Sequence, residues 1–433
     1  MKRLTKAILV MVPSLCLPTL AAATTDEEYQ ALEARLAQLE AARSAASDAP
    51  ATASRLKVNG FMSAGFGRVD IDDYDYDGLS EEWSHKTDSV VGIQLDSQVN
   101  AQTHAVVQLV GRGNEDFAID AEWAYVGWRP DSSNELRAGR QRYPFFMLSE
   151  YIDVGFSYPW ATPPSEVYLP GFPSSYDGLS WKYMHTSGSW THDFQAYWGS
   201  SEFPAGGGSF ELNNGMGIGL LSSKGNWQFS LLYSQAESSF AGNQLLDTLV
   251  LTGQLEPLDG DVGKYGGIGV QYDNGKLLFL AEATTIIVDG FFPDNDQAYA
   301  TVGYRFGKFL PHLTYSSSSI TDQNERADNP VIPALCAGVG LCLPDGWAGA
   351  PDGNPDPFPA NTVARALENA QYSVTLGVRY DFLPNADLKV DWTHVLDTRG
   401  TLGLFNRTDG NVFYGALPDD DIDLFRVVVD VVF

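Results

Sequence analysis

The sequence predicts an all-β chain: a transmembrane β-barrel of about sixteen antiparallel strands, preceded by a short N-terminal coiled-coil helix. Apolar and polar side chains alternate from Leu56 to Phe433, and tight turns alternate with long loops between these segments. Beyond the first residues, no apolar run reaches the roughly 18 residues of a transmembrane helix. A closed barrel is then the structure that can face lipid, because it pairs all its backbone groups.

The N-terminus has the pattern of an export signal. In "MKRLTKAILVMVPSLCLPTLAAA", a basic start is followed by an apolar stretch and by small residues ending at Ala23. This order is typical of a secretory signal peptide, which predicts that residues 1–23 are removed. The mature chain would then keep Cys336 and Cys342 in "CAGVGLC", and in an exported protein these most simply form a local disulfide.

Residues 24–46 have helical spacing. Tyr29, Leu32, Leu36 and Leu39 recur three and four residues apart with charges between them, which predicts a short coiled-coil helix. The alternative is a helical spacer. The small, proline-bearing residues 47–55 predict a linker before the barrel domain, residues 56–433.

From Leu56 onward the period is two. The last segment, "DLFRVVVDVVF", sets an apolar face against Arg426 and Asp430. A soluble sandwich would pack such a face inward, whereas an outer-membrane barrel turns it to lipid. We expect strands near 56–68, 88–100, 102–113, 119–129, 134–143, 177–185, 189–199, 215–223, 226–237, 264–273, 276–288, 296–306, 308–317, 370–381, 386–396 and 422–433.

The connections favour the membrane barrel. Tight turns such as "TSGS", "SKGN" and "DNGK" alternate with long segments at 69–87, 144–176, 200–214, 238–263, 318–369 and 397–421. Short turns on one rim and long loops on the other are typical of bacterial barrels. Aromatic residues near strand ends, including Trp123, Tyr125, Trp128, Tyr197 and Trp198, suit interfacial girdles.

These features resemble the Gram-negative general porin superfamily. The resemblance covers Leu56 to Phe433 and rests on the first strand "LKVNGFMSAGFGRVD", on "ELRAGRQRY" before a long third loop, and on the terminal aromatic Phe433, an assembly signal. The N-terminal helix is similar to that of DcaP-like trimeric porins. The resemblance implies an outer-membrane homotrimer, in contact with lipid and lipopolysaccharide, whose water-filled pores pass ions and small hydrophilic solutes without a cofactor.

The resemblance also implies that residues 144–176 fold into the lumen as a constriction. The acids Glu150, Asp153 and Glu166 would then face the channel. Strand parity predicts an inner wall with the bases Arg112, Arg137, Arg305, Arg379, Lys389 and Arg426, one of Arg140 and Arg142, and the acids Asp96, Glu282, Asp381, Asp391 and Asp430. Acid facing base across a narrow space would favour polar solutes.

Charge and motifs limit the remaining functions. The net charge of −28 makes nucleic acid an unsuitable partner. No catalytic motif is recognisable, so we expect no enzymatic activity. The acidic rim favours cations in a nonspecific pore, whereas the inward arginines favour an anion or dicarboxylate uptake channel; a structural tether of the outer membrane is a further alternative.

The stretch "VDIDDYDYDGLSEEW" begins like a calcium-binding loop. Asp73, Asp75 and Asp77 match its first ligand positions, but the closing Glu is replaced by Ser84. We interpret these aspartates as part of an anionic outer rim, and as a weak metal site at most.

Overall fold

The computed structural model describes residues 56–168, 173–205, 208–241, 259–289, 293–322, 368–408, 417 and 421–433. The predicted signal peptide, coiled-coil helix, linker and Cys336–Cys342 disulfide lie outside the described residues. Within these ranges, no helix is long and apolar enough to cross a membrane.

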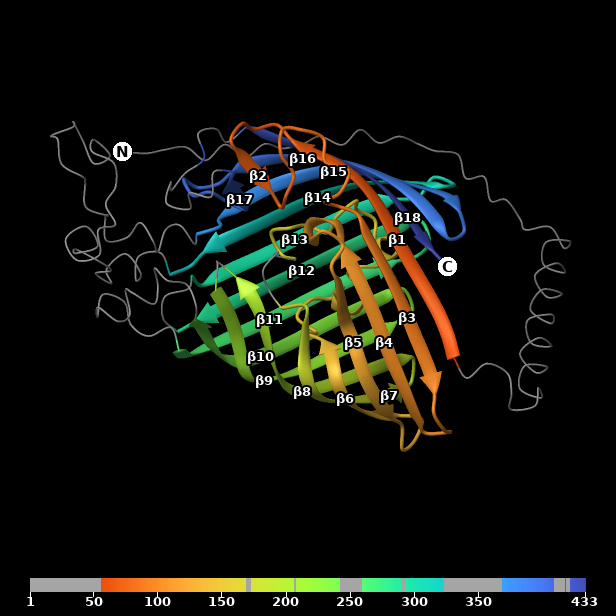
Figure 1. Cartoon of the computed structure of the whole chain (residues 1–433). Coiled ribbons are helices and arrows are strands. Elements are labelled where there is room, and N and C mark those ends of the chain that lie inside the picture. Colours follow the sequence, from red (N-terminus) through yellow and green to blue (C-terminus); the bar gives the residue numbers. More distant parts are fainter. Residues whose placement is uncertain are drawn as a thin grey trace, which may run out of the picture. The chain divides into compact units, whose positions relative to one another are not determined.

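Sixteen strands form a closed antiparallel barrel in chain order, which confirms the predicted fold class (Figure 1). The barrel strands are β1 (Leu56–Val69), β3 (Val90–Gln98), β4 (Thr103–Arg112), β5 (Ile119–Trp128), β6 (Asn134–Arg142), β7 (Ser175–Ser187), β8 (Trp190–Ala205), β9 (Gly208–Lys224), β10 (Trp227–Ala241), β11 (Asp259–Asp273), β12 (Leu277–Val288), β13 (Asn295–Tyr304), β14 (Phe309–Ile320), β15 (Gln371–Leu383), β16 (Ala386–Asp397) and β18 (Ile422–Val432). Strand β1 pairs with both β3 and β18, so the two ends of the chain close the sheet.

The strand ends that the long connections join lie at one rim, and the tight turns lie at the other. One expected loop was wrong: most of residues 200–214 is strand, because β8 runs to Ala205 and β9 begins at Gly208. The same hairpin pairs Phe203 with Phe210, whose ring centroids lie 5.3 Å apart. These cross-strand contacts extend the two strands beyond the expected positions.

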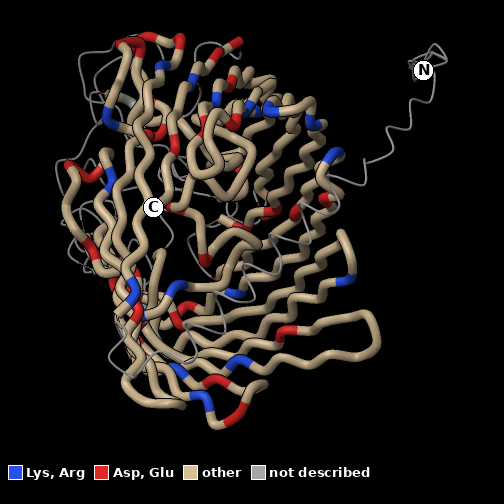
Figure 2. The backbone as a smooth tube through the Cα atoms, turned by 90° about the vertical axis from the view of Figure 1, so that its right-hand side faces the viewer, with Lys and Arg blue, Asp and Glu red and all other residues tan. Residues whose placement is uncertain are grey.

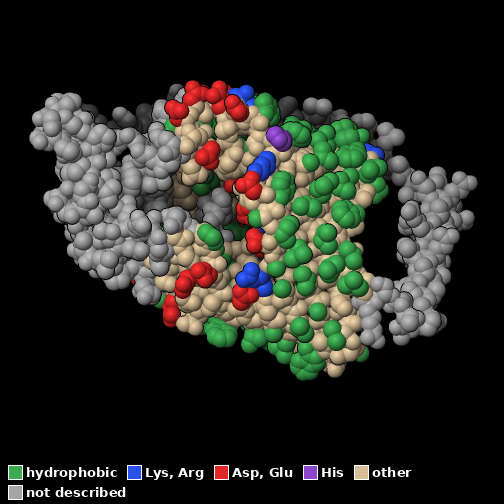
Figure 3. All heavy atoms as spheres, in the orientation of Figure 1, with side chains coloured by type: hydrophobic (Ala, Val, Ile, Leu, Met, Phe, Trp, Pro, Cys, Tyr) green, Lys and Arg blue, Asp and Glu red, His purple; other side chains and the backbone are tan. Residues whose placement is uncertain are grey.

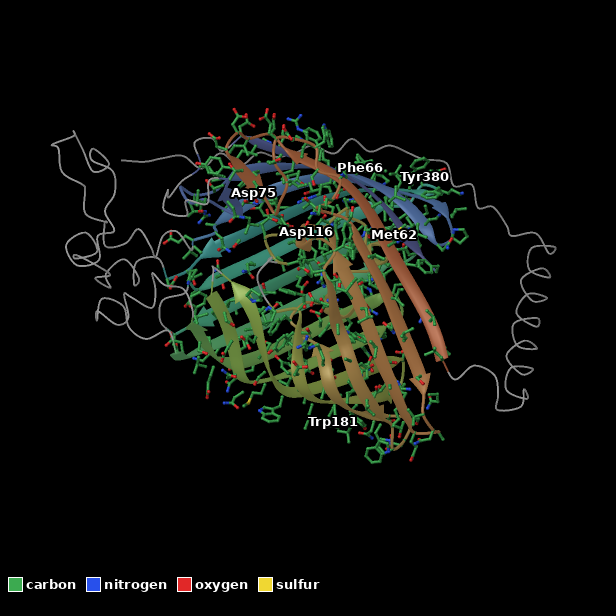
Figure 4. All side chains as sticks on the ribbon, viewed as in Figure 1. Met62, Phe66, Asp75, Asp116, Trp181 and Tyr380 are labelled. Carbon is green, nitrogen blue, oxygen red and sulfur yellow. The ribbon has the colours of Figure 1, made fainter. Side chains whose placement is uncertain are left out.

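The outer face of the barrel is apolar. Met62, Phe66, Ile218 and Ile268 point outward and are 46%, 51%, 63% and 59% exposed. Figure 3 shows hydrophobic side chains spread over the outside of the wall, and Figure 4 labels Met62, Phe66 and the outward Trp181. Exposed apolar residues in this number suit lipid, since a soluble protein would bury them.

Two of the expected girdle aromatics face inward instead. Tyr125 and Tyr197 are 6% and 5% exposed, and Trp128 and Trp198, on the opposite parity, are 45% and 53% exposed. Strand β5 has a bulge opposite Gln108 and Leu109 of β4. This bulge changes which side chains of β5 face inward and which face outward near Trp123. The sequence spacing therefore assigned only part of the girdle correctly.

A second, two-stranded sheet, formed by two of the long loops, is separate from the barrel sheet. Strand β2 (Tyr74–Tyr76), in the first long loop, pairs with β17 (Phe405–Arg407), in the last one. Tyr76 is buried and its ring meets Phe405 edge-to-face at 4.8 Å. Neither strand was predicted from the sequence, because three-residue strands are stabilised by tertiary packing rather than by their own pattern.

The C-terminal residue takes part in barrel closure. The backbone N–H of Phe433 donates to Gly60 O at 2.9 Å, and the Gly60 N–H donates to Phe433 O at 2.7 Å. A Cβ atom on Gly60 would lie 2.3 Å from the Phe433 ring, so only glycine allows this approach. The role of Phe433 as an assembly signal stays a prediction.

Candidate functional site

The third long connection, residues 143–174 between β6 and β7, folds into the lumen; we call it loop 3. It contains two single 3₁₀ turns, Ser149–Tyr151 and Gly155–Ser157. Figure 2 shows irregular backbone inside the ring of strands. The described part of loop 3 bonds to the inner faces of strands from β4 round to β18, as the following contacts show.

The middle of loop 3 is fixed to β13, β14 and β16. Trp160 is 1% exposed, and its Nε1 donates to the Thr301 and Thr314 hydroxyl oxygens at 3.1 and 2.8 Å. The next backbone N–H, of Ala161, donates to Asp391 Oδ2 at 2.8 Å. The predicted wall acid Asp391 therefore faces inward, where it holds the loop.

Two further carboxylates bond to neutral groups. Glu282 on β12 accepts from the Met147 N–H at 2.8 Å and from the Tyr168 hydroxyl at 2.6 Å. Glu166 on loop 3 accepts from the Ser373 hydroxyl at 2.6 Å and from the amide of Gln371. Glu166 is 2% exposed, so it is buried against the wall rather than facing open channel as expected.

A cluster of four charges joins loop 3 to β4, β5 and β6. Arg112 binds Asp153 through Nε at 2.9 Å and also pairs with Glu122, while Arg142 pairs with Asp153. Burial opposes ionisation of Asp153, but Arg142 and Arg112 outweigh it and hold the pKa of this carboxyl below its usual range. Asp153 is therefore a buried anchor, in contrast to the channel-facing acid that was expected.

A second buried cluster lies under the turn Gly155–Ser157. Lys389 Nζ donates to Asp430 Oδ2 at 2.9 Å and to Gly155 O at 2.5 Å, and the Ser63 hydroxyl donates to Asp430 Oδ1 at 2.5 Å. A Cβ on Gly155 would lie 2.0 Å from Asp430 Oδ1, so the loop backbone touches the wall. Both predicted residues, Lys389 and Asp430, face inward.

The remaining predicted wall residues are also paired. Arg137 binds Glu135 at 2.8 Å, Arg305 binds Asp273 at 2.7 Å, Arg379 binds Asp381 at 2.8 Å and Asp387 at 3.0 Å, Arg426 binds Asp88 at 3.2 Å, and Asp96 accepts from Gln94 at 3.1 Å. Arg140 points outward from β6 and binds Asp177 at 2.7 Å. Of the two arginines, Arg142 is the one that turns into the lumen, where it pairs with Asp153.

Two cavities adjoin loop 3. The larger, of about 560 Å³, lies between residues 144–151 of the loop and the wall from β6 to β12. The smaller, of about 320 Å³, lies between the loop and the wall from β11 to β15, beside Arg305 and Arg379. Glu150, 46% exposed at its side chain, faces the larger cavity and pairs with Lys182. Burial raises the pKa of Glu150 less than Lys182 lowers it, so the pKa lies below its usual range.

Four charged residues that line the larger cavity were not predicted from the sequence: Arg129, Glu135, Lys182 and Asp193. Lys182 lies on β7 and Asp193 on β8. A signal was present, because Lys182 and Asp193 alternate with the outward Trp181 and Phe194 and so share the parity of the lumen. Trp160 and Gln371 gave no such signal, since their role depends on partners far along the chain.

The aspartate run forms part of the outer rim. Asp73 and Asp77 adopt left-handed backbone conformations, with φ of 65° and 52°, and Asp75 Oδ1 accepts from the Gly78 N–H at 3.2 Å. Among the described residues, no group of three metal-ligating side chains is arranged to hold an ion. Burial raises the pKa of Asp77 to about 6, despite the nearby Arg426. Figure 4 labels Asp75 in this loop.

Comparisons with solved structures agree with this architecture. The DcaP channel of Acinetobacter baumannii aligns over 87% of this chain and 97% of its own, with 11% identity and a TM-score of 0.53. An anion-selective porin from Comamonas acidovorans aligns over 87% and 99%, with 12% identity and a TM-score of 0.51. Salmonella typhi OmpF, solved with daunomycin, aligns over 87% and 97%, with 13% identity and a TM-score of 0.50.

Neither a protein-family model nor a curated protein sequence matches the chain. Because identities of 11–13% carry information on architecture only, the comparisons establish the fold. The chain has the fold of the Gram-negative outer-membrane porins, a sixteen-stranded barrel.

Proposed function

We propose that the chain forms an outer-membrane channel for passive diffusion of ions and small hydrophilic solutes, with a preference for cations. The observation that carries the proposal is a loop bonded inside the lumen of a closed barrel whose outer face is apolar. An enzyme is not needed to explain the arrangement, since the inward charges bond to one another and to loop 3.

The charge arrangement supports cation preference. Every basic residue predicted for the wall, from Arg112 to Arg426, forms an ion pair with a carboxylate. Glu166 and Glu282, by contrast, accept hydrogen bonds from neutral groups and form no ion pair with a described residue. Local potential sets which ions occupy a narrow pore, so the surplus of carboxylates favours cations.

We further propose that the chain is a homotrimer whose subunits meet near β5 and β6. Only five residue pairs, from Ala124↔Arg140 to Trp128↔Leu136, join these strands. Residues 119–123 of β5 have no partner on β6, and the outward Arg140 and Asp177 are 42% and 59% exposed at their side chains. Lipid tolerates neither unpaired backbone nor exposed charge, so a partner subunit suits this part of the wall.

A second candidate is an uptake channel selective for anions or dicarboxylates. Arg305 and Arg379 beside the smaller cavity favour it, and one similar structure is an anion-selective porin. A tether of the outer membrane is the remaining alternative. For the channel we also propose an N-terminal coiled coil, contacts with lipopolysaccharide and a disulfide between Cys336 and Cys342.

The test is the reversal potential of the refolded protein in planar bilayers under a tenfold KCl gradient. We expect current in three equal steps and a reversal potential of cation-selective sign. A reversal potential of the opposite sign would favour the anion channel, and a folded protein without conductance would contradict the channel altogether.

A further inference from the structure

The larger cavity beside loop 3 has more chemical character than a nonspecific pore requires. It is lined by aromatic and aliphatic side chains of the loop and of β10, including Phe146, Tyr151 and Leu232, and by a few charged groups. Wide water-filled lumens are polar throughout, whereas small-molecule sites combine an apolar wall with a few placed polar groups. A volume of about 560 Å³ is also within the range of such sites.

Six charged side chains line this cavity: the bases Arg129 and Lys182, and the acids Glu135, Glu150, Asp193 and Glu282. Lys182 lies opposite Gln195 in the β7–β8 ladder, so Asp193, two residues along the same face, is its diagonal neighbour. On the loop side, Lys182 pairs with Glu150. Lys182 is thus shared between two carboxylates and Arg129 pairs with Glu135, so acids outnumber bases in the lining.

Asp193 has free acceptor capacity. Its carboxylate makes no hydrogen bond or ion pair with any part of the chain that the structure describes, and the residue is only partly exposed. A carboxylate of this kind in a partly apolar cavity is poorly hydrated and has no cation to itself, since its neighbour Lys182 pairs with Glu150. A ligand ammonium group would supply that cation, and the rings of Phe146 and Tyr151 would receive its apolar body or interact with its charge.

We propose that this cavity is a binding subsite for organic cations, namely amines that carry an aromatic or aliphatic body. Asp193 and Glu150 bind the ammonium group, and Phe146, Tyr151 and Leu232 contact the body. The inference rests on the proposed channel function and names a solute class for it.

The experiment measures block of KCl current by 2-phenylethylammonium in planar bilayers. We expect concentration-dependent block, with ethylammonium, which lacks the ring, and 3-phenylpropionate, which lacks the positive charge, at least about tenfold weaker. Equal block by 3-phenylpropionate would overturn the proposal.

Two variants change the block in opposite directions. Asp193→Asn removes the free carboxylate and should raise the dissociation constant of the amine about tenfold, whereas Lys182→Met leaves both carboxylates free and should lower it. The matched control is Asp96→Asn, an inward carboxylate on β3 outside the cavity, which should change block less than about twofold. A purely structural role of these residues would weaken block in both cavity variants.

The readouts separate this inference from the proposed function. A wild-type channel that conducts KCl but is not blocked refutes the subsite alone. If the folded protein does not conduct, the proposed function fails, and titration calorimetry with 2-phenylethylammonium on wild type and Asp193→Asn then decides the subsite by itself.

Discussion

The two halves of loop 3 attach to the barrel by different physics. Residues 153–168 are held by buried polar bonds, such as those of Asp153 with Arg112 and Arg142 and of Trp160 with two threonines. Residues 144–151 make one such bond, from the Met147 N–H to Glu282, and otherwise pack through aromatic contacts such as that of Phe145 with Tyr265, whose ring centroids lie 5.1 Å apart. They also carry the half-exposed pair of Glu150 with Lys182.

The difference separates positioning from solute contact. Buried polar bonds are directional, and each broken partner leaves an unsatisfied group, so they fix the second half in one place. Aromatic packing and an exposed ion pair tolerate small shifts. The first half, which lines the larger cavity, can therefore adjust to solutes while the second half stays fixed.

The largest expected effect comes from Asp153→Asn. It leaves Arg112 and Arg142 with Glu122 as their one shared acidic partner, beside the longer pair of Arg112 with Glu115 at 3.7 Å, which should destabilise the folded barrel by about 3–5 kcal/mol. Thermal unfolding in detergent checks the loss, and single-channel recording should show altered conductance as loop 3 is released. An unchanged unfolding temperature would contradict the anchoring role.

The pH dependence of the wild type tests the same anchor. The pKa of Asp153 is lowered in the folded state, so its stabilising contribution is complete above the ordinary aspartate range near about 4 and is lost as pH falls through the lower folded value. We therefore expect the difference in unfolding temperature between the wild type and Asp153→Asn to stay constant between about pH 7 and 5. A change in this difference within that pH range would contradict the anchoring role of Asp153.

An intermediate effect is expected for Gly155→Ala. The added Cβ would meet Asp430 Oδ1 at 2.0 Å and Ser63 Oγ at 2.8 Å, so the turn must move away from the wall. Overpacking of this kind costs about 1–3 kcal/mol. Gly188→Ala, in a turn where a Cβ meets nothing within 4 Å but φ is +61°, controls for the general cost of replacing a glycine. The comparison fails if both variants lower the unfolding temperature equally.

The smallest effect belongs to the first half. Glu150→Gln removes a half-exposed ion pair and should change the free energy of unfolding by less than about 1 kcal/mol. Chemical denaturation measures this change beside that of Asp153→Asn. A loss as large as that of the Asp153 variant would show that the two halves do not differ in attachment.

The barrel could be predicted because its signal is local. A period of two along segments such as Gln371–Leu383 reports directly which side chains face lipid, and tight turns separate the strands. The inward bases and acids followed from the same parity. The alternation could not decide which of Arg140 and Arg142 turns inward, because both residues lie at the end of β6.

Loop 3 could be placed in the lumen from the sequence, but its contacts with the barrel wall could not be predicted. Glu166 and Asp153 look like solvent-facing acids in the sequence, because their partners Gln371 and Arg112 come from other strands. The short β2–β17 sheet was missed for the same reason: its packing depends on residues more than three hundred positions away. Tertiary contacts of this kind leave no local pattern.

The closure between β1 and β18 has a consequence for folding kinetics. Ser63 and Asp430 bond at 2.5 Å although 367 positions separate them, and β2 joins β17 across the same seam. Contacts of such high sequence separation carry a large loop-closure cost and form late. Hairpins such as β8–β9 should assemble first, and the seam should be the slow final step, with the edges of β1 and β18 open to aggregation until it forms.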